Sequence, residues 1–358
     1  MDVIGVTFSD KKIKVGNRFI GTGEPVFVIA EAGVNHNGDV NLAKRLIDVA
    51  VESGADAVKF QTFHADHMVT CTAAKADYQK STTSSEESQY EMIKNLELSD
   101  DVFLELADYT RKQKILFLST PFDEESVELL DRIDVPAYKI SSGEITNFPL
   151  LKKIAEKKKP VIMSTGMATL GETEDAFHYL KKCGSEDIII LHCTTSYPAP
   201  VVSVNLNAMK TLRCAFHVPI GYSDHTEGIT IPIAAVAMGA CVLEKHFTCD
   251  RTLPGPDHKA SLESHELKAM ITAIRDIELA KGTGIKIPND DEEEIKKVAR
   301  KSIVAKKNIE SGTILDESML DFKRPGTGIE PIFLHRVVGK ISKKEFMKDD
   351  LILWEYLK

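Results

Sequence analysis

The chain has 358 residues, 43% of them hydrophobic and 28% charged, which is typical of a globular protein with room for two domains. Its formal net charge of -9 argues against nucleic acid or an acidic membrane as a general partner. The six cysteines form no CxxC pair, the first fourteen residues lack an apolar signal core, and no apolar stretch is long enough to cross a bilayer. We therefore expect a cytoplasmic protein with no membrane and no nucleic-acid partner.

Short apolar runs recur along the first three quarters of the chain. Their length and their content of β-branched residues favour buried parallel strands. The eight runs are residues 26–30, 57–60, 115–118, 137–140, 161–163, 188–191, 219–222 and 241–244.

The segments between these runs have helical periodicity. One apolar stripe lies in residues 43–50 and stops before Gly54, a second lies in 103–110 behind Ser99, and a third lies in 267–274 behind Ser264. Eight strands alternating with helices predict an α/β fold, a (β/α)8 TIM barrel. A doubly wound open sheet is the alternative, but no GxGxxG motif follows the first strand.

Two parts of the chain depart from this pattern. Residues 66–97 form a polar connection rich in Ser, Thr and Glu, and its length predicts a lid or a substrate wall. Beyond the eighth unit, the acidic run 290–294 is typical of a solvated helix start, and β-like pieces at 302–305, 311–315 and 337–340 follow. The expected division is a barrel at 1–281, a linker at 282–299 and a small domain at 300–358.

A polar side chain stands at the end of each predicted strand, where a barrel enzyme has its active site. Glu31 ends the first strand and is a candidate general base, or else a helix cap. Lys59 and Lys139, beside clusters of Ser, Thr and Gly, predict a bound phosphate or carboxylate. His225 and His246 end neighbouring strands, and imidazole is a common ligand of transition metals, so the pair predicts an open metal site.

Other polar residues have simpler interpretations. His36 is expected to stabilise a turn, and His217, His258 and His265 are expected at the surface or in loops. Cys193 has no thiolate-stabilising neighbour in the sequence and is expected to pack in the core.

At these strand ends the chain resembles the sialic acid synthase family over nearly its whole length. The matching segments are 31–38 (EAGVNHNG), 59–62 (KFQT), 119–122 (STPF), 137–144 (AYKISSGE), 164–167 (STGM), 191–194 (LHCT), 197–198 (YP), 221–226 (GYSDHT), 244–248 (EKHFT) and 254–258 (PGPDH). In the tail, 323–328 (KRPGTG) resembles the antifreeze-like (SAF) domain of the family, which has a β-clip fold.

The resemblance implies condensation of phosphoenolpyruvate with N-acetylmannosamine or a 2,4-diacetamido-2,4,6-trideoxy-mannose. The products would be a nine-carbon α-keto acid, sialic or legionaminic acid, and phosphate. It also implies a divalent metal, usually Mn2+ with Mg2+ or Co2+ as alternatives, and a homodimer that swaps its tail domains. A metal-dependent pyruvate aldolase and a carbohydrate-binding or ice-binding module on an inert barrel are the rival interpretations.

The resemblance also assigns roles to residues. Glu31 would be the main acid–base group, and His225 and His246 would bind the metal. Phosphoenolpyruvate would be held by Lys59, Thr120, Lys139, Ser142, Ser164 and Ser223, and by Thr195, where some members have an asparagine. The sugar would be contacted by Gln61, Glu144, Tyr197 and Asp257, and by Arg324 reaching into the site of the partner subunit.

Overall fold

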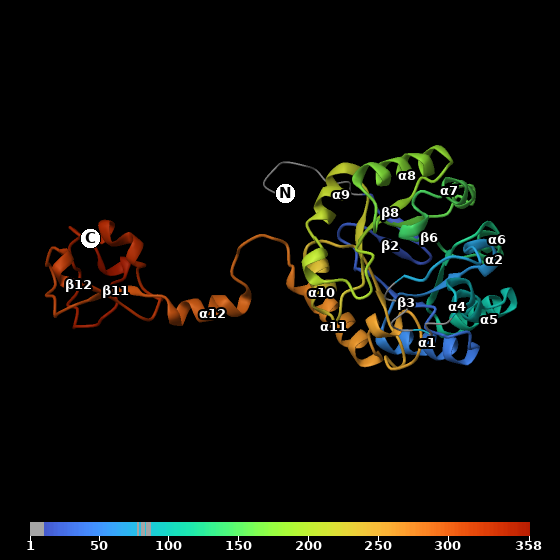
Figure 1. Cartoon of the computed structure of the whole chain (residues 1–358). Coiled ribbons are helices and arrows are strands. Elements are labelled where there is room, and N and C mark those ends of the chain that lie inside the picture. The colour runs from blue at the N-terminus through green and yellow to red at the C-terminus, as the bar shows by residue number, and fades with distance from the viewer. Residues whose placement is uncertain (1–10, 77–78, 80–82, 84–86) are drawn as a thin grey trace. The chain divides into compact units, whose positions relative to one another are not determined.

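The computed structural model describes residues 11–76, 79, 83 and 87–358. The chain divides into two compact units, Met1–Gly282 and Thr283–Lys358, shown in Figure 1. Residues 1–10 and most of the Ser/Thr-rich stretch 80–86 lie outside the described residues, so the expectations that concern them stay predictions.

The first unit contains one sheet of eight parallel strands. They are β3 (Phe27–Gly33), β4 (Ala57–Thr62), β5 (Leu116–Pro121), β6 (Tyr138–Ile140), β7 (Val161–Ser164), β8 (Ile188–Cys193), β9 (Ile220–Asp224) and β10 (Val242–His246). The hydrogen-bonded order is β5-β4-β3-β10-β9-β8-β7-β6, and the end strands β5 and β6 lie next to each other. The sheet therefore curls almost into a closed barrel, and the predicted fold class is confirmed.

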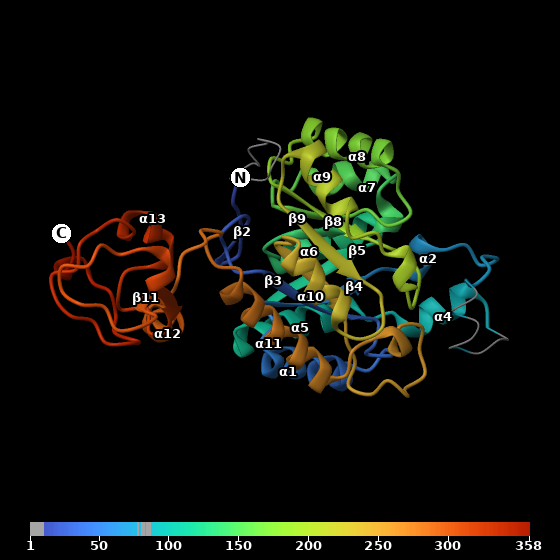
Figure 2. The ribbon, with the colours of Figure 1, turned by 90° about the vertical axis from the view of Figure 1, so that its left-hand side faces the viewer.

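Helices surround this sheet in both views (Figures 1 and 2). They are α1 (Val40–Ser53), α5 (Asp100–Gln113), α6 (Glu124–Ile133), α7 (Phe148–Ala155), α8 (Leu170–Lys182), α9 (Ala208–Phe216), α10 (Thr230–Ala237) and α11 (Ser264–Ala280). The three predicted apolar stripes are the buried faces of α1, α5 and α11. Gly54 ends α1 at φ +84°, as expected, but Glu263 rather than Ser264 is the N-cap of α11, and its backbone N–H donates to the Glu266 side chain at 2.8 Å.

A short hairpin at the start of the described chain, which no sequence pattern indicated, fills one end of the barrel interior. It consists of β1 (Ile13–Val15) and β2 (Arg18–Ile20), paired antiparallel. Its buried residues pack with those at the beginnings of the barrel strands, among them Ile29 and Ile162. The hairpin closes the end at which the strands begin, which leaves the other end as the open mouth.

The long connection 66–97 is partly helical. It contains the last part of α2 (Ala65–Met68) and α4 (Gln89–Leu96), whose apolar residues form a small core with Val34 and Phe63. Both ends of the connection are therefore anchored to the first unit. Its role as lid or wall stays a prediction.

The second unit has a core of its own, around Ile303, Val337 and Phe346. It contains α12 (Asp290–Ala299), which begins in the acidic run as expected, and the antiparallel pair β11 (Ser302–Ala305) and β12 (Leu320–Lys323). The prediction of a β-like piece at 337–340 was wrong at its start, because Val337 ends the helix α13 (Leu334–Val337). Among the described residues, none of the helices is long and apolar enough to cross a membrane.

Candidate active site

The carboxyl ends of the barrel strands enclose a cavity of about 210 Å³. Its walls include the following sequence-predicted residues: Glu31, Lys59, Gln61, Thr120, Lys139, Ser142, Ser164, Thr195, Tyr197, Ser223, His225 and His246. A larger hollow of about 630 Å³ lies around the beginnings of the strands. Barrel enzymes have their active sites at the opposite end, where the strands finish. The structure thus gathers most of the predicted site into one mouth.

Strand register explains why residues distant in the sequence meet here. In the parallel ladders, His246 of β10 lies opposite Glu31 of β3, and Glu31 lies opposite Lys59 of β4. Ser223 of β9 lies opposite Glu244 of β10. Each strand continues past its apolar run into these polar residues, so their side chains share one rim.

Two carboxylates and two lysines form a buried network inside the mouth. Lys59 Nζ lies 2.8 Å from Glu31 Oε2 and 3.6 Å from Glu244 Oε2, while Lys139 Nζ lies 3.3 Å from Glu244 Oε1. Ser223 donates a hydrogen bond to Glu244 at 2.9 Å. Glu244 stands at a strand end like the others, but no sequence pattern indicated a role for it.

The surroundings push the pKa values of the two carboxyls apart. Burial, reinforced by the neighbouring Glu244 charge, raises the pKa of Glu31 to about 7 in spite of Lys59. Burial would also raise the pKa of Glu244, but Lys139 and Lys59 hold it well below its usual range. One carboxyl is therefore suited to exchanging a proton near neutral pH, and the other is a fixed anion.

A group of hydroxyls opposite this network has hydrogen-bonding capacity to spare. Among the described residues, the buried Ser164 Oγ and Thr195 Oγ1 have no hydrogen-bond partner. The backbone N–H of Gly166 donates to Ser142 Oγ at 2.9 Å, and a Cβ at Gly166 would lie 2.0 Å from Thr195 Oγ1. Because buried polar groups are normally paired, the unpartnered hydroxyls of Ser164 and Thr195 fit the oxygen atoms of a bound anion. Threonine at position 195 thus supplies one of these hydroxyls.

The two predicted metal ligands are adjacent. The ring centroids of His225 and His246 lie 5.5 Å apart. His225 Nδ1 donates to the carbonyl of Thr194 at 2.8 Å, which leaves Nε2 as the free ligand atom. Among the described residues, His246 Nδ1 is buried without a hydrogen-bond partner, and burial and the nearby His225 lower the pKa of His246 well below its usual value. A ring nitrogen left unused on each of two adjacent imidazoles fits a divalent transition metal.

The predicted sugar ligands are placed less uniformly. Gln61 and Tyr197 line the cavity, and the Tyr197 ring lies 4.1 Å from that of His225. Asp257 is buried with Oδ2 3.9 Å from His246 Nδ1. Glu144, in the 3-10 turn η1 (Ser142–Glu144), does not line the cavity and accepts a hydrogen bond from Asn147 at 2.7 Å. Arg324 is an exposed residue of the second unit.

Three simpler expectations have mixed outcomes. His36 stabilises a turn, because its Nδ1 accepts from the backbone N–H of Gly38 at 3.1 Å. His258 lies in the connection between β10 and α11, as expected of a loop residue, but it is buried there and bonds Thr248 at 2.8 Å. Cys193 is buried, as expected. It lines the mouth with Sγ 3.8 Å from His225 Nδ1, a neighbour that only the fold supplies.

The chain is similar to known proteins over most of its length. The chain matches the NeuB family model over residues 46–286 and the SAF domain model over residues 300–358. It is 53% identical to the N,N'-diacetyllegionaminic acid synthase of Campylobacter jejuni, with 91% of this chain and 98% of that protein covered. It is 46% identical to the enzyme of the same name from Legionella pneumophila, with 98% and 99% covered.

A solved structure is also similar. The N-acetylneuraminic acid synthetase of Leptospira borgpetersenii, in complex with citrate, superposes with a TM-score of 0.71 at 39% identity. The match covers 81% of this chain and 96% of that one. Both kinds of comparison thus extend over the unit that holds the mouth described above.

Proposed function

The chain belongs to the NeuB family, and from this membership we propose that it joins phosphoenolpyruvate to an open-chain amino sugar, giving a nine-carbon α-keto acid and phosphate. Two of its relatives are named N,N'-diacetyllegionaminic acid synthase, which supports 2,4-diacetamido-2,4,6-trideoxy-mannose as acceptor, with N-acetylmannosamine as the alternative. The observation that carries the proposal is a mouth that combines lysines, unpartnered hydroxyls and two carboxyls with opposite proton affinities. The aldolase and carbohydrate-binding interpretations are not favoured.

The mouth suits phosphoenolpyruvate because that substrate carries two anionic groups. Lys59 and Lys139 supply positive charge, and Glu244 fixes both ammonium groups in place. Ser164 and Thr195 offer hydroxyl donors for phosphate or carboxylate oxygens. Charge-assisted hydrogen bonds of this kind are stronger than neutral ones, particularly where water is excluded.

The reaction needs proton transfers to and from the oxygen atoms bonded to the carbon that bears the phosphate. The enol carbon bonds to the aldehyde carbon of the sugar, whose oxygen takes up a proton, and the neighbouring carbon becomes electron-poor. Water adds there, and Glu31 takes the proton that this water loses. The carbon–oxygen bond to phosphate then breaks, and Glu31 returns the proton to the departing oxygen. As the new carbonyl forms, the hydroxyl left by the added water releases its remaining proton to solvent, which balances the proton taken up by the aldehyde oxygen.

The histidine pair supports a metal-assisted version of this chemistry. When bound at His225 and His246, a divalent metal would supply Lewis acidity toward the aldehyde oxygen. We propose Mn2+ for this position, with Mg2+ or Co2+ as alternatives. The support is the chemical fit of two adjacent imidazoles, each with an unused ring nitrogen.

Phosphate release tests the proposed function. The full-length protein with Mn2+ is supplied with phosphoenolpyruvate and a panel of acceptors that differ in the substituents at C4 and C6 of the sugar. We expect phosphate and a nine-carbon keto acid in equal amounts, fastest with the diacetamido-trideoxy sugar. The proposal would be refuted if no acceptor supported phosphate release, or if the protein condensed pyruvate in place of phosphoenolpyruvate with the sugar.

Lys139→Met is expected to weaken phosphoenolpyruvate much more than the sugar. Loss of a hydrogen bond to a charged group costs about 1.5–3 kcal/mol, so the KM for phosphoenolpyruvate should rise by roughly ten- to a hundredfold. Separate saturation curves for the two substrates measure this. Lys157→Met is the matched control, because Lys157 is a mostly buried lysine paired with Glu128 and Asp131 outside the mouth. An unchanged phosphoenolpyruvate curve would contradict the role.

We further propose a homodimer in which residues 300–358 of each chain, joined through residues 282–299, act at the partner's mouth. The proposal rests on the resemblance of Lys323–Gly328 to the family's tail. It is supported by the exposure of Arg324, whose guanidinium suits a polar, multiply oxygenated ligand. The SAF domain match covers the same residues.

Mixing two inactive variants tests this arrangement. Arg324→Ala and His246→Ala chains, unfolded together and refolded, should regain activity, because one mouth of each mixed dimer has both an intact histidine pair and an intact arginine. Random pairing predicts roughly a quarter of wild-type activity. A mixture of His225→Ala with His246→Ala is the control, since none of its dimers has a complete mouth. Mixed dimers without recovered activity would place Arg324 in its own subunit or outside the site.

We also propose that the protein works in the cytoplasm. All six cysteines are free thiols, as expected in a reducing compartment. Fractionation of the source cells, followed by detection of the protein, would test this.

A further inference from the structure

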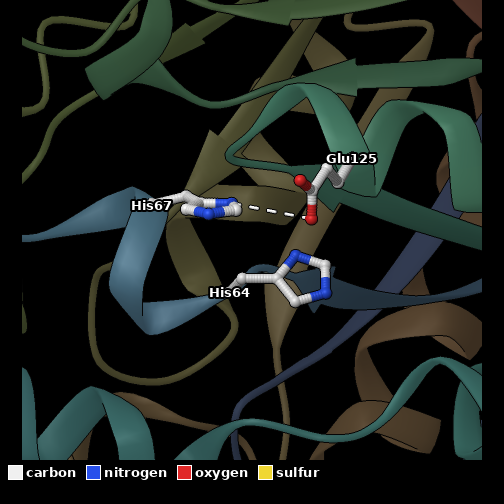
Figure 3. Close-up of side chains that lie close together, drawn as sticks. All are labelled: His64, His67 and Glu125. Carbon is white, nitrogen blue, oxygen red and sulfur yellow. Dashed lines mark ion pairs between the residues drawn. The ribbon is translucent and has the colours of Figure 1, made fainter.

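Two histidines and a glutamate lie close together, as Figure 3 shows, and none of the three lines the mouth cavity. His64 immediately precedes α2, His67 lies within α2, and Glu125 lies in the first turn of α6. Each offers one ligand atom, and the three atoms all lie within 4.8 Å of one another. We propose that these residues form a second divalent metal site, selective for a transition metal such as Zn2+ or Ni2+.

The donor set and its spacing fit such an ion. Two imidazoles with one carboxylate are typical ligands of Zn2+ and Ni2+, whereas Mg2+ prefers oxygen ligands. Bonds of about 2.0–2.2 Å place two ligands of a tetrahedral ion about 3.3 Å apart. His67 Nδ1 lies 3.7 Å from Glu125 Oε2, and these two side chains are 49% and 68% exposed, so a small rotation would close the difference.

His64 is held in place by carboxylates, as metal-binding imidazoles usually are. Its Nδ1 lies 3.3 Å from Asp123 and its Nε2 lies 3.4 Å from Asp100. Asp123 is fixed in turn, because its side chain accepts from the backbone N–H of His64 at 2.8 Å and from that of Ser126 at 2.7 Å. A metal on one ring nitrogen would replace the carboxylate beside it and leave the other nitrogen with a carboxylate acceptor, which orients the ring.

The local charge also favours a cation. Asp100 and Asp123 lie beside His64, and Glu125 lies beside His67; Arg132 offsets one of these three negative charges, because it pairs with Asp100 at 2.8 Å. Both His67 and Glu125 line a hollow of about 300 Å³ with room for water on the ion. The alternative is that the cluster consists of ion pairs alone, with His64 protonated between Asp100 and Asp123. The two possibilities differ in metal stoichiometry.

The position of the cluster gives the site a structural consequence. Phe122 lines both this hollow and the mouth cavity. A bound ion would tie α2, where the long connection 66–97 begins, to α6 beside the wall of the mouth. Binding that favours the folded state would also raise the melting temperature.

Metal counting on the full-length protein tests the site directly. The metal-free chain is dialysed against Zn2+ alone, and in a second series Ni2+ alone, and the bound equivalents are measured by metal analysis. We expect His67→Ala and Glu125→Gln to bind one equivalent fewer than the wild type and to show a smaller metal-dependent rise in melting temperature. Both altered side chains are exposed, so these variants should fold.

His178→Ala is the matched control. His178 is an exposed histidine of α8 that lies 3.8 Å from Glu174. Among the described residues, it belongs to no group of three possible metal ligands. It should keep the wild-type stoichiometry, and His246→Ala combined with His67→Ala should bind less than either single variant. Equal numbers of bound ions in the wild type, His67→Ala and Glu125→Gln would overturn the proposal.

Discussion

Replacing His246 with alanine is expected to lower the rate of phosphate release by about a thousandfold while the fold persists. The change leaves His225 as the one imidazole of the pair, too few protein ligands to retain a labile divalent ion. Loss of roughly 4 kcal/mol of charge stabilisation in the transition state corresponds to that factor. Steady-state phosphate release at saturating substrates measures the rate, and circular dichroism with thermal melting checks the fold.

The control separates a metal ligand from a general effect of losing a histidine. His217 caps the end of α9 away from the cavity lining, so His217→Ala should keep wild-type turnover. Wild-type protein treated with chelator should lose activity and regain it with Mn2+, whereas His246→Ala should not respond. Full activity of His246→Ala after chelation would remove the metal assignment.

The barrel and the position of its mouth could be predicted because they depend on local patterns. An apolar run of four or five residues is a strand buried on both faces, and eight such runs separated by helical stripes leave few alternatives. The polar residue that follows each run must then lie at the carboxyl rim. For this reason Glu31, Lys59, His225 and His246 were placed in one cavity without knowledge of any contact.

What could not be predicted depends on contacts between distant elements. The position of Glu244 between two lysines follows from the meeting of β4, β6 and β10, and its sequence neighbours do not indicate it. The strands of the N-terminal hairpin have three residues each, too short for a periodic signal. The second metal site joins His64 and His67 to Glu125 on another helix, so no compact spacing motif marks it.

The proton affinity of Glu31 is the clearest chemical consequence of this network. An exposed carboxyl would be ionised throughout the neutral range, but burial moves the pKa of Glu31 to about 7. The ionised form, which can accept a proton from water, therefore becomes populated as the pH rises through this value. The kcat/KM of the wild type should accordingly fall as the pH drops below neutrality. This fall begins at a higher pH than it would with an ordinary carboxyl.

Glu31→Gln is expected to lower kcat/KM by about 10²–10⁴-fold at pH 8 and to remove this acidic limb, because the amide keeps the shape of the side chain but transfers no proton. Rate profiles between pH 5.5 and pH 9, roughly two units around neutrality, measure both effects. Lys139→Met, which weakens phosphoenolpyruvate binding but retains Glu31, should still show a fall of kcat/KM on the acidic side of the profile. If Glu31→Gln keeps it as well, the ionisation belongs to another group. Asp257 would then be the candidate, because burial raises its pKa to about 6, and Asp257→Asn should remove the limb instead.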